Sequence, residues 1–143
     1  MTDEKPLSFV DTNVLMYAFD KSGSPKAPVA QGLISELMAE DRLRLSTQVL
    51  QELFVTLTRK VSQRCSSQEA LAVLDDLTAW PFIVIDYGTI RAAADLSDQA
   101  KLSFWDALIV VAAARIGAAV LYTEDLNAGQ EILGVRISNP FSI

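Results

Sequence analysis

Short apolar runs and longer stretches of helically spaced apolar residues alternate along the chain. The short runs are rich in strand-forming residues and predict strands over Leu7–Val10, Leu43–Ser46, Phe82–Ile85, Ala119–Tyr122 and Val135–Ile137. The longer stretches predict helices over Val29–Ala39, about Thr47–Val61, Ser67–Trp80, Asp86–Gln99 and Ser103–Ile116. Residues 17–28 carry a glycine and two prolines, which predict turns between the first strand and the first of these helices.

Strands that alternate with helices predict parallel βαβ units and therefore an α/β fold, a three-layer α/β/α sandwich. The order of the strands in the sheet does not follow from this pattern. With 143 residues, half of them hydrophobic, we expect a single domain over residues 1–143 that buries a substantial core.

Composition narrows the setting and the chemistry. No apolar run reaches the roughly 20 residues that span a bilayer, and charged residues precede the first short run, so we expect neither a membrane segment nor a signal peptide. With Cys65 as the one cysteine there is no disulfide framework, and we expect a free thiol in a cytoplasmic protein. The absence of histidine excludes Ser–His–Asp and Cys–His triads and histidine-ligated zinc.

Four acidic residues occupy places where a carboxylate is costly unless it is used. Asp11 ends the first buried strand, and Asp125 follows the fourth strand in the same way, after a hydroxyl residue. The alternative for Asp125 is a turn-forming aspartate, and Glu124 is a rival for its role. Asp86 also follows a strand, but it could simply cap the next helix, so we leave it out of the site.

The other two candidates lie on predicted helices. Asp106 is the one charged residue between positions 102 and 114, in a helix that is apolar nearly all round and therefore buried. The alternative is a first-turn acid three residues after Ser103, which resembles a capping box. Glu52 has no Lys or Arg at the positions of an intrahelical pair, although it could be an ordinary solvated glutamate.

If these four carboxylates meet, they need a cation. Like charges about 4 Å apart repel by about 4 kcal/mol at an effective dielectric constant near 20. Mg²⁺ or Mn²⁺ removes that repulsion, and hard oxygen ligands favour these ions. The net charge of −6 is unusual for a nucleic-acid binder, but without the four candidates 14 acids nearly balance 12 bases. Acidity therefore does not exclude RNA as substrate.

The segments around these residues resemble PIN-domain nucleases, and within them the VapC-type toxins of bacterial toxin–antitoxin pairs. The matching segments are Phe9–Leu15, Gln51–Leu53, Phe104–Ile109, Leu121–Leu126 and the tail Val135–Phe141. The resemblance implies a Rossmann-like parallel sheet of about five strands in the order 3-2-1-4-5.

The resemblance also implies the site. Residues matching Asp11, Glu52, Asp106 and Asp125 hold one or two Mg²⁺ or Mn²⁺ ions in that family, and those matching Asn13 and Thr123 orient the ligands. The family cuts RNA to leave 3′-hydroxyl and 5′-phosphate ends. Its toxins inhibit translation, usually form homodimers and are held by a small antitoxin protein.

Several rivals remain open at this stage. A haloacid-dehalogenase-like phosphatase needs a second aspartate where this chain has Asn13, and a receiver domain does not place an acid at the start of a buried helix. A non-catalytic PIN module that only binds RNA, and a PIN nuclease that works without an antitoxin, are the nearer alternatives. Candidate phosphate contacts are Lys21, Lys26, Arg59, Lys60 and Arg115, each of which could equally be an ordinary solvated cation.

Overall fold

A computed structural model, which describes residues 5–59 and 65–142, contains a six-stranded sheet in the order β3-β2-β1-β4-β6-β5. All neighbouring strands are parallel except β5 and β6, which form an antiparallel hairpin at one edge. The strands are β1 (Ser8–Val10), β2 (Leu43–Ser46), β3 (Phe82–Ile83), β4 (Val120–Tyr122), β5 (Glu131–Ile132) and β6 (Val135–Ser138).

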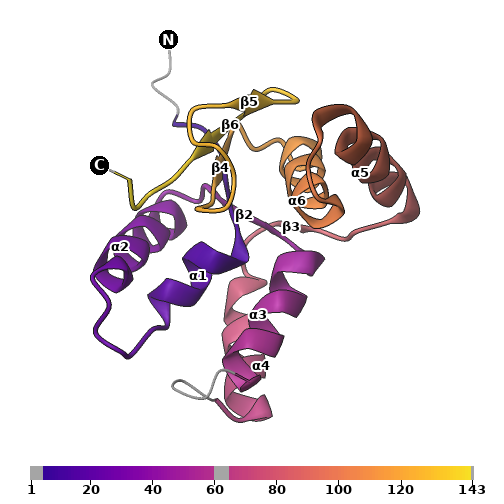
Figure 1. Cartoon of the computed structure of the whole chain (residues 1–143). Helices are drawn as coiled ribbons and strands as arrows, with labels where there is room; N and C mark the ends of the chain where they lie inside the picture. The colour runs from indigo at the N-terminus through magenta and orange to yellow at the C-terminus, as the bar shows by residue number, and fades with distance from the viewer. Residues whose placement is uncertain (1–4, 60–64, 143) are drawn as a thin grey trace.

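Helices cover both faces of this sheet and complete three layers (Figure 1). One side carries α1 (Thr12–Ala18) and α2 (Lys26–Ala39), and the other carries α5 (Tyr87–Ala100) and α6 (Phe104–Arg115). The pair α3 (Thr47–Arg59) and α4 (Ser67–Leu77) packs together beside β2 and β3. Within the described ranges, no helix is long and apolar enough to cross a bilayer.

The core lies where β1 and β4 pack against α6. All three residues of β1 are fully buried, as a short strand in the middle of a parallel sheet requires. In α6 the seven residues from Ala107 to Ala113 are all buried, so this helix lies inside the protein along most of its length. The first turn of α6 and the carboxyl ends of β1 and β4 are therefore fixed by the best-packed part of the molecule.

The predicted three-layer α/β/α fold is confirmed, and so is the strand order if β6 is counted as the predicted fifth strand. Several details differ. Helix α2 begins at Lys26, three residues before the predicted Val29, and α4 ends at Leu77, three residues before the predicted Trp80. The two-residue strand β5 is too short for periodicity to reveal. Strand β3 ends at Ile83, two residues before the predicted end, and Val84 after it is exposed.

Helix α1 was not predicted, and it extends into the start of the predicted turn region. Three consecutive residues of α1, Val14, Leu15 and Met16, are buried, so its sequence does not show the spacing of apolar residues typical of a helix. The last residues of the second predicted helix, 60 and 61, lie outside the described residues.

Candidate metal centre

The first two candidate residues meet because their strands are neighbours. Val10 in β1 is in register with Tyr122 in β4, and the Asp11 amide donates to the Tyr122 carbonyl at 3.0 Å. The chain therefore leaves both strands at the same edge of the sheet. At that edge Asp11 lies beside the buried Thr123, and Asp125 follows two residues later.

Asp11 is a buried carboxylate that makes hydrogen bonds but no ion pair with any described residue. As N-cap of α1 it accepts from the Thr12 amide at 2.7 Å with Oδ1, and its Oδ2 accepts from the Thr123 hydroxyl at 2.9 Å. Burial raises the pKa of Asp11 to about 6, against the lowering effect of these two hydrogen bonds, and the charges of Glu52 and Asp125 raise it further. The fold thus holds this group in place while disfavouring its negative charge.

Glu52 reaches the same place from α3. It is half-buried, and its Oε1 accepts from the Thr12 hydroxyl at 2.9 Å, so residues 40 positions apart in the chain are joined at the start of α1. Thr12 is a positioning residue that we did not select from the sequence. In the sequence, Thr12 is marked only by its hydroxyl group and its position directly after the strand-ending Asp11.

Asp106 has the first-turn position that the capping-box alternative requires, but it does not complete a capping box. Ser103 caps α6 and accepts from the Asp106 amide at 3.1 Å, so Asp106 does lie in the first turn. No reciprocal bond from its carboxylate to the Ser103 amide is formed, unlike the complete capping box of Ser66 and Glu69 in α4. The Asp106 carboxylate is half-buried and faces the pocket that contains the other candidates.

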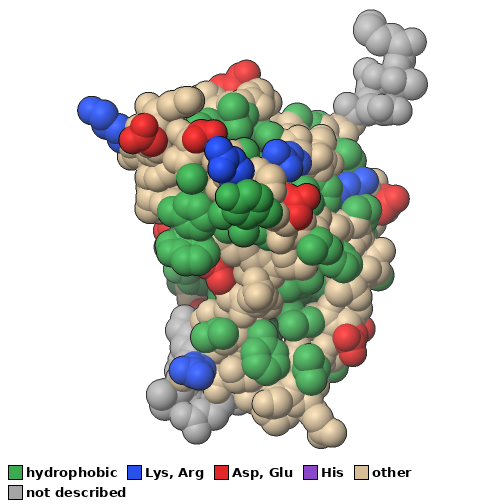
Figure 2. Space-filling model, turned by 90° about the vertical axis from the view of Figure 1, so that its right-hand side faces the viewer, with side chains coloured by type: hydrophobic (Ala, Val, Ile, Leu, Met, Phe, Trp, Pro, Cys, Tyr) green, Lys and Arg blue, Asp and Glu red, His purple; other side chains and the backbone are tan. Residues whose placement is uncertain are grey.

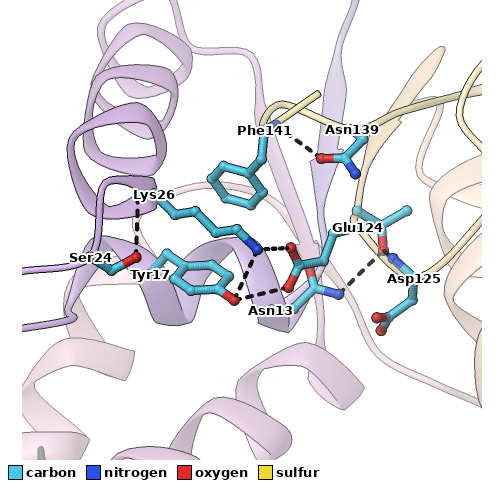
Figure 3. A network of polar contacts seen from close by, with 9 residues as sticks. Asn13, Tyr17, Ser24, Lys26, Glu124, Asp125, Asn139 and Phe141 are labelled. Carbon is cyan, nitrogen blue, oxygen red and sulfur yellow. Dashed lines mark hydrogen bonds and ion pairs between the residues drawn. The ribbon is translucent and has the colours of Figure 1, made fainter. Parts of the chain in front are cut away.

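Glu124 and Asp125 differ in their contacts, because Glu124 belongs to a separate polar network (Figure 3). Glu124 accepts from the Tyr17 hydroxyl at 3.1 Å and pairs with the Lys26 ammonium group at 2.9 Å. Lys26 also lies over the rings of Tyr17 and Phe141, at 5.0 and 5.3 Å. Asp125 points away from this network, and its amide donates to the Thr123 hydroxyl at 3.2 Å. Glu124 therefore uses its carboxylate to hold the loop after β4 against Tyr17 and Lys26, although both Glu124 and Asp125 line the pocket.

All four candidate carboxylates line one pocket of about 600 Å³. They come from the end of β1, from α3, from the first turn of α6 and from the loop after β4, which lie far apart in the sequence. No described Lys or Arg forms an ion pair with any of the four. Asp20 and Glu124 also line the pocket, whereas its described lining contains no basic side chain. The arrangement concentrates negative charge without an internal counter-charge.

The donor set fits a hard divalent cation. Every candidate metal ligand is an oxygen atom. The Asn13 Oδ1 atom is a buried hydrogen-bond acceptor without a partner among the described residues, while the Asn13 Nδ2 atom donates to the Thr123 hydroxyl at 3.4 Å. Over residues 5–59 and 65–142, no three acidic side chains are already arranged to hold a metal ion. Like charges repel each other unless a cation lies between them, so a bound ion would be needed to bring these side chains together.

The remaining predicted residues lie elsewhere. Asp86 caps α5, accepting from the Thr89 amide at 2.8 Å, and lies 3.7 Å from Arg115, in agreement with its omission. Arg115 also donates to the Thr89 hydroxyl, so it serves the α5–α6 contact. Lys21 and Arg59 are exposed and do not line the pocket, and Lys60 lies outside the described residues. Cys65 is half-buried.

Comparisons with known proteins agree with this geometry. The family model of the PIN domain matches residues 8–130. No curated protein matches the chain in sequence. Among solved structures, a toxin–antitoxin complex from Klebsiella pneumoniae is 22% identical with a TM-score of 0.68, and the alignment covers 95% of this chain and 99% of the other.

Two further solved structures have the same fold. A DNA-bound VapBC from Salmonella typhimurium is 18% identical with a TM-score of 0.65, over 95% of this chain and 99% of the other. The toxin VapC20 of Mycobacterium tuberculosis, which cleaves the sarcin–ricin loop, is 21% identical with a TM-score of 0.63, over 90% and 98%. At these identities the likeness establishes the shared fold.

The raised pKa of Asp11 predicts that Asp11→Asn stabilises the metal-free protein. The unfolded state releases the Asp11 proton near pH 3.8 and the folded state near pH 6, so wild-type stability falls as the pH rises between these values. Above pH 6 the penalty is complete, at about 3 kcal/mol, and near pH 5 roughly half of it remains. Urea unfolding in EDTA should show the variant more stable by up to that amount at pH 8.

The diagnostic result is the pH dependence of the difference between the two proteins. A gain that shrinks from pH 8 to pH 5 fits an ionised, buried Asp11. An equal gain or loss at both pH values would contradict it. Asp86→Asn is the matched control, because it makes the same change at another strand-following helix cap whose pKa is lowered by bonds from the Thr89 side chain and backbone.

Proposed function

The chain belongs to the PIN-domain family, a family of nucleases, and we propose that it is a metal-dependent endoribonuclease. One observation carries the proposal. Carboxylates from the end of β1, from α3, from α6 and from the loop after β4 line one pocket, with no basic side chain in its described lining. Such a concentration of negative charge is costly in a folded protein unless a cation compensates it.

In this proposal Asp11 and Asp106 are the first ligands of Mg²⁺ or Mn²⁺, and Glu52 and Asp125 complete the acidic pocket. When bound, the ion polarises the phosphate, lowers the pKa of a water molecule and stabilises the leaving alkoxide. The hydroxyl of Thr123 fixes Asp11, and that of Thr12 fixes Glu52. Asn13 contributes a buried amide oxygen beside them. These bonds hold ligands in place before substrate arrives, which lowers the cost of assembling the site.

The reaction is hydrolysis of an RNA phosphodiester. Water attacks phosphorus in line with the leaving 3′-oxygen, a carboxylate of the pocket removes the proton of the water, and the 3′-oxygen leaves with a proton. The products carry 3′-hydroxyl and 5′-phosphate ends. Because the chain has no histidine, proton transfer depends on carboxylates, and the elevated pKa of Asp11 in the metal-free site reflects how dry that environment is.

We further propose that the protein is the toxin of a type II toxin–antitoxin pair that inhibits translation in the cytoplasm. The support is the fold shared with chains from two toxin–antitoxin complexes and with an RNA-cleaving toxin, over nine-tenths or more of this chain. In this setting the chain forms a homodimer and binds a small antitoxin protein. A PIN nuclease without an antitoxin remains the alternative for its biological role.

Metal binding should appear as added stability. With Mg²⁺ or Mn²⁺ at 100 times its dissociation constant, binding to the folded state alone adds about 2.7 kcal/mol to the free energy of unfolding. Thermal unfolding with the ion and with EDTA measures this gain. Asp106→Asn should lose most of it, whereas Asp86→Asn should retain it. Equal melting temperatures for the wild-type protein in both buffers, at millimolar metal, would argue against a metal site.

RNA cleavage tests the activity. Wild-type protein with Mn²⁺ should cut a mixture of single-stranded and hairpin RNAs, and EDTA should stop the reaction. Asp11→Asn and Asp106→Asn should each reduce the rate at least a hundredfold, because each removes a charged ligand. Asp86→Asn should cleave at the wild-type rate. Ends that accept 5′-labelling only after dephosphorylation would identify the 5′-phosphate product.

The toxin role has a separate test in cells. Induced expression of the wild-type chain should arrest growth, and Asp11→Asn, which keeps the fold, should not. Co-expression of the small protein encoded next to this gene should restore growth, and that small protein should co-purify with the chain. A protein that cleaves RNA in vitro but neither arrests growth nor recruits such a partner would be the antitoxin-independent nuclease.

A further inference from the structure

A tryptophan lies exposed beside the acidic pocket. Trp105 directly precedes Asp106 in the first turn of α6, lines the same pocket and has 63% of its surface exposed. The other tryptophan, Trp80, is half-buried and packs against the core. Folding does not account for the exposure of Trp105, since the adjacent Phe104 already anchors this turn of the helix on the core.

The indole is presented from a fixed backbone. The rings of Phe104 and Trp105 meet edge to face, with centroids 5.2 Å apart and planes at 79°. The Trp105 carbonyl accepts from the side chain of Gln48 in α3 at 3.5 Å, and Gln48 is only 5% exposed. Ser103 caps the same turn. An aromatic surface restrained in this way loses little conformational entropy when a ligand stacks on it.

The negative charge of the pocket limits the ways in which it can bind RNA. The pocket lining includes six acidic side chains and, among described residues, no Lys or Arg, so it cannot attract a polyanion by basic side chains. On the face seen in Figure 2, basic side chains are scattered among acidic and apolar ones and form no continuous basic surface. Contacts with the uncharged bases are not opposed by this acidic lining, so they are a suitable source of affinity for RNA.

We propose that Trp105 is a stacking platform for one unpaired RNA base next to the scissile phosphodiester. This inference rests on the proposed nuclease function and narrows its substrate to single-stranded or looped RNA, because bases within a duplex already stack on each other. Val55 of α3, which is half exposed, and Met16 and Ile109 add apolar surface to the same pocket. Stacking of one base on an aromatic side chain typically raises affinity about tenfold.

Binding and cleavage together test the platform. Binding is measured in the Asp11→Asn, Trp80→Phe background, which leaves Trp105 as the single tryptophan and removes the cutting activity expected of the wild type. Titration with a short single-stranded RNA should quench Trp105 fluorescence, and an oligonucleotide of equal length with abasic sites should quench it little. Adding Trp105→Leu, with binding followed by fluorescence anisotropy of labelled RNA, should weaken binding about tenfold, whereas Trp105→Phe should bind nearly as tightly as the parent.

Comparing Trp105→Leu with Trp105→Phe shows whether RNA binding needs an aromatic ring at this position or only apolar surface area. Tyr87→Ala is the matched control, since Tyr87 is also an exposed aromatic in a helix first turn but does not line the pocket. In the cleaving protein, Trp105→Leu should raise KM about tenfold for single-stranded RNA, and Tyr87→Ala should leave KM unchanged.

The outcomes distinguish this inference from the function on which it rests. If the wild-type protein cleaves RNA but Trp105→Leu binds and cleaves as well as its parent, or if abasic or duplex RNA binds as tightly as single-stranded RNA, the stacking role is wrong and the nuclease stands. If the wild-type protein with Mn²⁺ neither binds nor cleaves any RNA, the proposed function and the stacking role are both wrong.

Discussion

The structure depends on a buried carboxylate that forms no ion pair with any residue in the described ranges 5–59 and 65–142. Asp11 ends the central strand, caps α1 and accepts two short hydrogen bonds, yet its environment raises its pKa to about 6. A group arranged in this way reduces the stability of the metal-free protein at neutral pH. Proteins keep such groups where a ligand compensates the cost, so the energetic defect itself marks the functional site.

The rest of the fold brings further negative charge to the same place. The start of α1, the middle of α3 and the first turn of α6 all border the pocket, and two of these are helix N-termini, whose dipoles favour anionic groups. These dipoles and the hydroxyls of Thr12 and Thr123 moderate the repulsion without removing it. Glu124, which also lines the pocket, is paired with Lys26, whereas Asp125 has no ion pair with any described residue. The proposed cation would compensate the repulsion that remains.

Much of this could be predicted from the sequence because the informative residues break a local pattern. Asp11, Asp106 and Asp125 interrupt apolar stretches, and alternation of strands and helices gives the layers. Other features depend on tertiary contacts. The bond from Thr12 to Glu52 spans 40 residues, and the diversion of Glu124 needs Tyr17 and Lys26 to approach from another element. The helix α1 is short and buried along one turn, so its period is hidden.

The acidic character of the protein then has a physical explanation. Most nucleic-acid binders gain affinity from basic surface, whereas here the pocket repels a phosphate backbone until cations neutralise it. In the proposed function, binding of metal and of RNA is therefore coupled, because each reduces the electrostatic cost of the other. In such a site uncharged contacts decide which strands remain bound near the carboxylates. An exposed indole one residue from Asp106 is suited to that role, since every base offers a face for stacking and only an unpaired base can present it.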